Sequence, residues 1–416
     1  MMPNLIQYPV ALFGILRAGL IAVNVNPLYT QRELRHQLAD SGAKMVITIT
    51  NFATNIEKVL PDTQIEHVIL SKLADHQPFL KRTAMNFAIK YVKKLVPTYK
   101  LPQAHQYLNV LTQGAKHNYQ RPTCQPTDIA YLQYTGGTTG LAKGAVLTHG
   151  NIVANVLQVF DQFSPRTLLS KDKVVTPLPL YHIFALTANA LFSMKIGANS
   201  LLITNPRDMP GFVKILKGRR LSYITGVNTL FNGLIHTPGF EKLDFSNLRL
   251  SLGGGMAVQR FVADEWKRIT GCTLVEAYGL TETAPAVCIN PVTMKEFNGA
   301  IGLPLPSTEV SIRDAEGLEL GLNEPGELCV RGPQVMKGYW NRPEETANVM
   351  DDEGWLKTGD VAEINEEGFV KIVDRLKDLI IVSGFNVYPN EIEDVVAGHP
   401  KVLEAGAIGV VDDKSG

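Results

Sequence analysis

The chain is short of the residues that disulfide frameworks and metal centres need. Its 416 residues include four cysteines, which are scattered, and nine histidines without a paired-ligand spacing such as HExxH. Separated cysteines of this kind are typical of reduced thiols in a cytosolic protein. The composition therefore argues against a disulfide scaffold and against a zinc site. The cysteines are Cys124, Cys272, Cys288 and Cys329.

An excess of either charge is also missing, because 40 lysines and arginines balance 40 aspartates and glutamates. A protein whose main partner is nucleic acid usually carries a basic surface and a positive net charge. We therefore expect no nucleic-acid partner. Hydrophobic residues make up 45% of the chain and charged residues 19%, as in an ordinary globular protein.

Long uninterrupted apolar runs are absent as well. The stretch YPVALFGILRAGLIAVNVN, residues 8–26, is apolar but contains Arg17, so it has too few uninterrupted residues to span a bilayer. It predicts a helix, a turn at Ala18-Gly19 and a strand. We recognise no signal peptide and expect a cytoplasmic protein.

Strand and helix patterns alternate through most of the chain. The pattern AVQRFVADEWKRITG, for example, predicts a helix that stops at Gly271. This alternation is typical of an α/β fold with largely parallel sheets flanked by helices. Ligands of such sheets bind at the carboxyl ends of the strands. The predicted strands are 44–49, 67–71, 173–179, 200–204, 221–227, 248–254 and 273–279.

The pattern changes after about residue 300. Short strands and turns at 307–317, 326–336 and 361–375 predict a smaller β unit. Residues 387–411 predict a helix followed by a strand, as at the start of a small α+β domain. We therefore predict a large domain at 1–374 and the beginning of a small C-terminal domain at 375–416.

Residues 80–100, LKRTAMNFAIKYVKKLVPTYK, carry six basic residues and no acidic ones. Apolar residues recur in this segment at helical spacing, which predicts a basic amphipathic helix. Such a helix can bind an anionic membrane surface, but a solvated helix packed on the domain has the same charge pattern. Both interpretations stay open, and with them contact with the inner face of the cell membrane. The apolar residues are Ala84, Met85, Ala88, Tyr91, Val92 and Leu95.

The stretch YTGGTTGLAKGA, residues 134–145, combines glycines and threonines with one lysine and follows an apolar strand pattern. Glycines let a chain curl so that its N–H groups face an anion, and hydroxyl and ammonium groups add further donors. The stretch predicts a phosphate-binding loop, with a flexible connector as the alternative. It is not a Walker A loop, because Lys143 is followed by Gly144 and not by the Ser or Thr that holds Mg²⁺.

Four more stretches follow in order: LGGGMAV (252–258), EAYGLTETAP (276–285), WLKTGD (355–360) and DRLKDLIIVSGFNVYPNEIE (374–393). Together with the glycine-rich loop, this ordered set resembles the adenylate-forming family of acyl-CoA synthetases, luciferases and peptide-synthetase adenylation domains. The resemblance covers nearly the whole chain. Four stretches are most similar in sequence to the bacterial long-chain fatty acid–CoA ligases: YTGGTTGLAKGAVLTH, YGLTE, GPQVMKGYW and VSGFNVYPNEIEDVV.

The resemblance implies a reaction in two halves. A fatty-acid carboxylate attacks the α-phosphate of ATP and gives acyl-adenylate and pyrophosphate, and the thiol of coenzyme A then attacks the activated carbonyl and releases AMP. Thr281 would bond the α-phosphate, and Glu282 would be a ligand of Mg²⁺. His182 would lie at the wall between the acyl and nucleotide sites, or be a core histidine. The leaving phosphates would be held by Thr135, Gly136, Gly137, Thr138, Thr139, Gly140 and Lys143.

The resemblance also implies where the nucleoside and coenzyme A bind. Tyr278 would stack on adenine, Asp360 would accept hydrogen bonds from the ribose diol, and Arg375 would add donors. Lys377 would be the hinge between the domains. The glycines near the nucleotide would be Gly253, Gly254, Gly255 and Gly279, the pantetheine arm would face Ser383, Gly384 and Phe385, and the acyl pocket would be lined by Val227, Phe231, Gly255, Met256 and Ala286.

Each of these side chains also has a structural interpretation. Taken alone, Tyr278 is a core aromatic residue, Glu282 a helix cap, Asp360 a turn aspartate and Arg375 a member of a surface ion pair. The ordered set of motifs favours the functional roles over these alternatives.

The chain departs from the family pattern at both ends, where we expect it to be truncated. No residue matches the Gly-Lys motif with the adenylation lysine of the family, since Lys401 and Lys414 lie in other contexts. A weakened adenylation step is therefore expected. A long-chain fatty acid–CoA ligase is the leading hypothesis; a medium-chain or aryl acid–CoA ligase and a non-catalytic remnant that binds nucleotide or acyl-adenylate are the alternatives. A homodimer also stays open.

Overall fold

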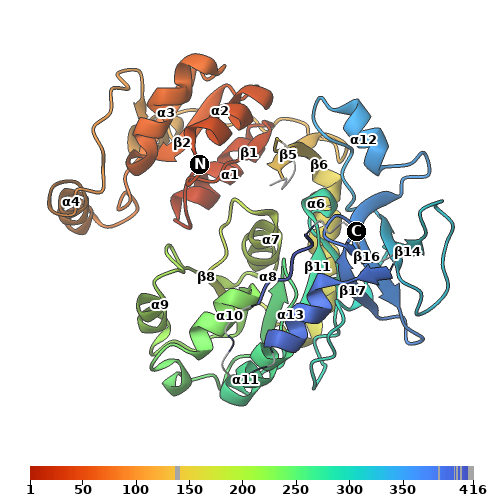
Figure 1. The fold of residues 1–416 in the computed structure, drawn as a ribbon. Coiled ribbons are helices and arrows are strands. Elements are labelled where there is room, and N and C mark those ends of the chain that lie inside the picture. The colour runs from red at the N-terminus through yellow and green to blue at the C-terminus, as the bar shows by residue number, and fades with distance from the viewer. Residues whose placement is uncertain (136–140, 383–384, 398, 400–401, 403–404, 411–416) are drawn as a thin grey trace.

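The computed structural model describes residues 1–135, 141–382, 385–397, 399, 402 and 405–410, and these form five β-sheets with helices packed around them (Figure 1). The first 115 or so residues lie at one end of the molecule, the largest sheet in the middle, and a four-stranded sheet beside it. The glycine-rich loop lies between β5 (Ile129–Tyr134) and β6 (Gly144–Thr148).

The largest sheet has seven strands in the order β13-β12-β11-β10-β9-β7-β8. Strands β7 to β11 run parallel, and β12 and β13 are antiparallel additions at one edge. The parallel register aligns Gly226 with Gly253, and Gly253 with Glu276, so these strands end at one edge of the sheet. The strands are β7 (Lys173–Thr176), β8 (Asn199–Leu202), β9 (Tyr223–Gly226), β10 (Leu250–Gly254), β11 (Leu274–Gly279), β12 (Ala286–Ile289) and β13 (Leu303–Pro304).

Helix α11 (Arg260–Thr270) shows how the sequence fixes the helices that cover this sheet. Val262, Ala263 and Trp266 recur at helical spacing and are buried, and Trp266 donates its indole N–H to Ser251 on β10 at 3.0 Å. The helix stops at Gly271, which adopts φ +69° as predicted. The other helices here are α6 (His149–Phe163), α7 (Ile183–Ala185), α8 (Phe192–Ile196), α9 (Met209–Leu216) and α10 (Asn228–Ile235).

The N-terminal part holds two small sheets. One has the order β1-β5-β6 and the other, all parallel, the order β2-β3-β4. The predicted helix, turn and strand at 8–26 are confirmed as α1, a turn with Gly19 at φ +70°, and β1. The elements are α1 (Gln7–Arg17), β1 (Ala22–Asn24), α2 (Gln31–Asp40), β2 (Met45–Ile49), α3 (Ala53–Val59), β3 (His67–Ser71), α4 (Phe79–Phe87), β4 (His105–Gln106), α5 (Tyr107–Gly114), β5 (Ile129–Tyr134) and β6 (Gly144–Thr148).

The predicted β unit after residue 300 is an antiparallel sheet with the order β14-β15-β16-β17. Its last strand ends at Arg375, where the boundary between the large and small domains is predicted. The elements are β14 (Glu309–Arg313), β15 (Gly326–Arg331), α12 (Pro343–Val349), β16 (Leu356–Ile364), β17 (Val370–Arg375), β18 (Ile380–Val382), β19 (Phe385–Val387) and α13 (Pro389–Ala397).

The strand predicted at the end of 387–411 is not found in its described part, because residues 405–410 form no strand. A strand exists only where its backbone groups pair with a neighbouring strand. Here the backbone N–H of Ala407 donates to the side chain of Glu393 at 2.9 Å, so α13 takes a donor that a strand partner would need. The predicted helix in the same segment is confirmed as α13.

Short 3₁₀ and π segments complete the structure of the described residues. Five of them directly adjoin an α-helix, and one carries the predicted site residues Thr281 and Glu282. The 3₁₀ segments are η1 (Thr50–Phe52), η2 (Leu60–Asp62), η4 (Ser164–Arg166), η6 (Phe240–Lys242) and η7 (Thr281–Thr283), and the π segments are η3 (Ala88–Val92) and η5 (Leu186–Leu191).

Replacing Phe231 by alanine should destabilise the fold by about 3–5 kcal/mol, because the buried ring leaves a cavity. Phe231 is fully buried and its ring centroid lies 4.7 Å from that of Trp266. Urea unfolding followed by tryptophan fluorescence would measure the change. Phe261→Ala, which removes a ring that is 54% exposed, is the control. Equal loss of stability in the two variants would contradict this packing role.

Candidate active site

The predicted site residues come from three sheets, on or after β5 and β6, β10 and β11, and β16 and β17. The glycine-rich loop follows β5 and leads into β6. Gly253 and Gly254 end β10, and Tyr278 and Gly279 end β11. Asp360 lies on β16 and pairs in register with Arg375 on β17.

The glycine-rich loop is closed at its base by the backbone. The N–H of Thr135 donates to the carbonyl of Lys143 at 2.9 Å, directly above the paired residues Tyr134 and Gly144. The predicted phosphate ligands Gly136, Gly137, Thr138, Thr139 and Gly140 lie outside the described residues. The structure therefore defines the two ends of the loop, which we call its stems. They are Tyr134–Thr135 at the end of β5 and Ala142–Lys143 before β6.

The side chain of Lys143 points toward a residue that sequence reasoning missed. Its Nζ lies 4.5 Å from the centroid of the Tyr339 ring, and the Tyr339 hydroxyl donates to Oε1 of Glu282 at 2.6 Å. Burial raises the pKa of Tyr339, and the Glu282 carboxylate raises it further, so the phenol stays protonated and acts as a donor. Tyr339 thus joins two residues with predicted catalytic roles.

Glu282 is the predicted Mg²⁺ ligand, and its surroundings fit a metal that is shared with phosphates. It lies in η7 directly after Thr281, and its backbone carbonyl accepts from the N–H of Met336 at 2.7 Å. Among the described residues no three His, Cys, Asp or Glu side chains gather as a metal site. Mg²⁺ commonly binds through one or two carboxylates and completes its shell with substrate phosphates and water. One carboxylate beside Tyr339 and Lys143 fits that mode of binding.

Tyr278 and Arg375 both contact Asp360, and the binding of adenine and ribose by these three residues stays a prediction. The Tyr278 hydroxyl donates to Oδ2 of Asp360 at 2.5 Å, and Nε of Arg375 lies 3.3 Å from Oδ1. Burial raises the pKa of Asp360, while the bond from Tyr278 and the charges of Arg375 and Lys377 partly offset the rise. Burial and the neighbouring carboxylate also raise the pKa of Tyr278. Asp360 is only 7% exposed, and Tyr278 and Arg375 hold its two carboxylate oxygens in place.

The glycines at the strand ends have packing reasons of their own. A Cβ on Gly279 would lie 2.0 Å from the carbonyl oxygen of Pro285, and one on Gly254 would lie 2.8 Å from that of Ala277. Gly255 has φ +79°, a left-handed conformation that favours glycine. Close backbone packing therefore requires these residues, and their contact with adenine stays a prediction.

His182 lies at the N-terminus of α7 and is open to solvent, so it is not the core histidine of the alternative interpretation. Its Nδ1 accepts from the N–H of Phe184 at 3.3 Å. The surrounding protein removes part of the water around the imidazole, and this desolvation lowers its pKa. Its place between the acyl and nucleotide sites stays a prediction.

The predicted acyl-pocket residues divide into two kinds. Phe231 is fully buried against Trp266 and Ala286 is 8% exposed, so both have packing roles. Met256 is 50% exposed, and Val227 faces the space beside Gly255. Lys377 follows the end of β17, and Ser383 and Gly384 lie outside the described residues. The hinge and the coenzyme A contacts therefore stay predictions.

A cavity of about 450 Å³ lies elsewhere, between α1, β1, α2 and β2. Its lining is mostly apolar and includes Leu12, Val25, Leu38, Val46 and Ile47. Of the predicted site residues that the structure describes, none lines this cavity.

The chain matches a protein-family model over most of its length. A family model described as AMP-binding enzyme matches residues 1–340. The chain belongs to the AMP-binding enzyme family. This confirms the family resemblance of the motifs, and the matched range includes the glycine-rich loop, Tyr278, Thr281, Glu282 and Tyr339.

Relatives and solved structures of AMP-binding enzymes resemble this chain over its whole length. A long-chain-fatty-acid–CoA ligase of Yersinia pestis is 57% identical over 416 residues, 100% of this chain and 74% of that protein. The 4-coumarate–CoA ligase 2 of Nicotiana tabacum is 31% identical over 425 residues, with 100% and 73% covered. Apo MatB from Rhodopseudomonas palustris has a TM-score of 0.79 at 27% identity, covering 100% of this chain and 75% of that one. These likenesses confirm the predicted α/β fold.

In this AMP-binding enzyme, His182 should be neutral at pH 7, because its surroundings lower the pKa of the imidazole below 6.5. Its ring should take up a proton only as the pH falls below that value. NMR of a chain with ¹³C-labelled histidine would follow the titration, and the signal lost in His182→Gln assigns the resonance. A midpoint above 6.5 would contradict the stated environment.

Proposed function

We propose that this chain activates a long-chain fatty acid with ATP and transfers the acyl group to coenzyme A, as an AMP-forming long-chain fatty acid–CoA ligase. The observation that carries the proposal is the 57% identity over the whole chain to a protein of that name, together with a 37% identity to the Bacillus subtilis protein of the same name. The aryl acid–CoA ligase of tobacco is more distant at 31% identity, which favours a fatty acid over an aryl acid.

In the proposed reaction, residues of the three sheets bind different parts of ATP. Thr135 and Lys143, with the loop between them, bind the β- and γ-phosphates that leave as pyrophosphate. Thr281 bonds the α-phosphate, where the fatty-acid carboxylate attacks. Asp360 accepts the ribose hydroxyls, and Arg375 donates beside it. The coenzyme A thiol then displaces AMP from the acyl carbonyl.

Mg²⁺ is part of this proposal, with Glu282 as its protein ligand. Bound there, the cation would neutralise charge on the phosphates. Tyr339 holds one oxygen of the Glu282 carboxylate through its hydroxyl, which orients the carboxylate. Tyr339→Phe should therefore weaken Mg²⁺-dependent ATP binding more than it weakens binding of AMP.

The long-chain assignment can be tested by calorimetry with non-hydrolysable acyl-adenylate analogues. The palmitoyl analogue should bind more tightly than the acetyl and benzoyl analogues. Asp360→Ala should weaken binding of the palmitoyl analogue about 10- to 100-fold, because it removes hydrogen bonds to a charged acceptor worth about 1.5–3 kcal/mol. Asp352→Ala, at an exposed aspartate in the same part of the chain, is the control.

Other outcomes of this experiment separate the alternatives. Tighter binding of the benzoyl analogue would favour an aryl acid–CoA ligase. Tight binding of the palmitoyl analogue without turnover would favour the non-catalytic remnant. No binding of any analogue by a folded chain would contradict the site.

We also propose that residues 80–100, with Phe79 at the start of α4, bind an anionic membrane surface. None of the residues of α4 and η3 is buried, and Phe79, Leu80, Phe87 and Val92 are between 58% and 81% exposed. Figure 1 shows α4 standing apart from the rest of the chain. Exposed apolar residues with basic residues and no acidic ones suit the surface of an anionic bilayer.

This helix cannot be a membrane span, since no helix of the described residues is long and apolar enough to cross a bilayer. Peripheral contact, a place on the inner face of the cell membrane, and formation of a homodimer stay predictions. The exposed helix supports the first two.

A variant with Phe79, Leu80, Phe87 and Val92 replaced by serine should lose most of its binding to phosphatidylglycerol vesicles. Co-sedimentation would measure it, and high salt should weaken binding of the unchanged chain, because the basic residues act through screened charge. The control replaces the exposed Leu168 and Leu169 by serine. Equal sedimentation of the two variants would contradict the membrane surface.

A further inference from the structure

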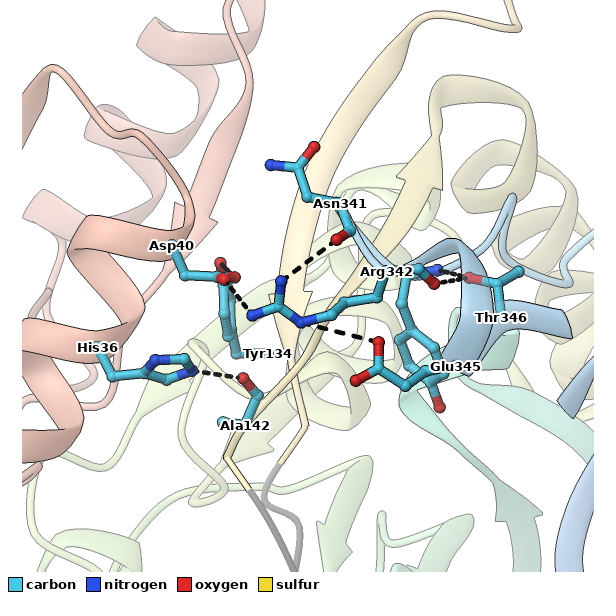
Figure 2. A network of polar contacts seen from close by, with 9 residues as sticks. His36, Asp40, Tyr134, Ala142, Asn341, Arg342, Glu345 and Thr346 are labelled. Atoms are coloured by element: carbon cyan, nitrogen blue, oxygen red, sulfur yellow. Dashed lines mark hydrogen bonds and ion pairs between the residues drawn. The ribbon is translucent and has the colours of Figure 1, made fainter. Parts of the chain in front are cut away.

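A network of polar contacts surrounds the two stems of the glycine-rich loop and uses no predicted site residue (Figure 2). We call it the stem network, and it consists of His36, Asp40, Tyr134, Ala142 and Arg342. His36 and Asp40 lie on α2, one turn apart, and face the stems. Arg342 reaches the same place from the segment before α12.

The first stem is held by Asp40. The hydroxyl of Tyr134, the last residue of β5, donates to Oδ2 of Asp40 at 2.7 Å. The Tyr134 ring is 7% exposed and packs over Gly144, where a Cβ would lie 3.1 Å from the ring. Because Thr135 follows directly, the direction in which the chain leaves β5 depends on this bond.

The second stem is held by His36. Its Nε2 lies 2.8 Å from the carbonyl oxygen of Ala142, which can only accept, so Nε2 carries the proton and donates. Ala142 directly precedes Lys143. Helix α2 therefore contacts both ends of the loop. Ala142 lies 106 residues after His36 in the sequence, and Tyr134 lies 94 residues after Asp40.

Arg342 ties this helix to the other side of the site. Its Nη2 donates to Oδ1 of Asp40 at 2.7 Å, and its Nε lies 3.8 Å from Glu345. Asp40 is the last residue of α2, at the end of the helix where a negative charge is unfavourable, so the arginine cation compensates its charge. The side chain of Asp40 is only 11% exposed.

The segment that carries Arg342 also carries Tyr339. Its backbone pairs with β6, because the N–H of Trp340 donates to the carbonyl of Gly144 at 2.8 Å. The N–H of Tyr339 donates to Thr346 at 2.9 Å, which Figure 2 shows beside Arg342. One short segment therefore takes part in the stem network through Arg342 and in the contact with Glu282 through Tyr339.

We propose that His36, Asp40 and Arg342 are positioning residues that set the two stems of the glycine-rich loop and thereby determine its affinity for the triphosphate of ATP. The proposal rests on the proposed function, in which this loop binds the β- and γ-phosphates. None of the three residues touches the nucleotide in this account. Their effect should therefore fall on ligands that reach the loop and spare ligands that do not.

ATP and AMP differ in that respect, so calorimetric binding of each in the presence of Mg²⁺ tests the proposal. Asp40→Asn keeps an acceptor for Tyr134 and loses the charge that holds Arg342; His36→Ala loses the donor to Ala142. Each should weaken ATP binding about tenfold, as expected for one lost hydrogen bond to a well-placed group, and leave AMP binding within about twofold. His36→Gln, which restores an N–H donor, should recover part of the loss.

Arg35→Gln is the matched control. Arg35 lies on the same helix and forms an exposed ion pair with Asp62 at 2.8 Å, away from the loop. It should change neither affinity. Asp40→Asn and Arg342→Gln combined should weaken ATP binding no more than either alone, because the two residues act through one contact.

The outcomes separate this proposal from the proposed function. If the unchanged chain binds ATP no more tightly than AMP, the loop is not the phosphate site, and both proposals are overturned. If it prefers ATP and the variants keep that preference, or lose ATP and AMP equally, the positioning role alone is overturned. Thermal unfolding of each variant checks folding; if Asp40→Asn does not fold, the pair His36→Ala and His36→Gln decides.

Discussion

The hydrogen bond between Tyr278 and Asp360 joins the two sheets on which the candidate site depends. Tyr278 ends a parallel strand of the seven-stranded sheet, and Asp360 lies on the antiparallel four-stranded sheet. The bond from Tyr339 to Glu282 is a separate contact, between the segment that pairs with β6 and η7, which follows β11. A buried polar group that loses its partner costs about 1–3 kcal/mol, so the bond between Tyr278 and Asp360 favours a single arrangement of the two sheets. In that arrangement Asp360, the predicted ribose ligand, contacts Tyr278, and Glu282, the predicted metal ligand, contacts Tyr339, whose ring lies beside Lys143 of the glycine-rich loop.

The sequence predicted the parts of the site that lie in short motifs. The alternation of strands and helices, the stop at Gly271 and the placement of Tyr278 at a strand end follow from local patterns, and the structure has them. The motifs also brought Asp360 and Arg375 to one position, because both belong to neighbouring strands of one antiparallel sheet. Local patterns succeed where the deciding contacts are within a strand, a turn or a hairpin.

Contacts between distant segments could not be predicted in this way. Arg342 and Asp40 are separated by 302 residues, and no pattern around either residue signals the other. Tyr339 lies in the quoted stretch GPQVMKGYW, but its contact with Glu282 depends on how the segment after β15 packs against β6 and η7. The strand predicted at 405–411 failed in its described part for the same reason, since pairing decides a strand and Glu393 binds the N–H of Ala407. The packing of Phe231 against Trp266 is another such contact, and its place in the acyl pocket stays a prediction.

The central claim is that three sheets of this chain bind one ATP molecule, and a crystal structure with ATP and Mg²⁺ tests it most directly. The account predicts the β- and γ-phosphates between Thr135 and Lys143, the ribose hydroxyls on Asp360, and Mg²⁺ bound by Glu282 and phosphate oxygens. A nucleotide bound elsewhere, or one whose phosphates point away from the glycine-rich loop, would contradict it.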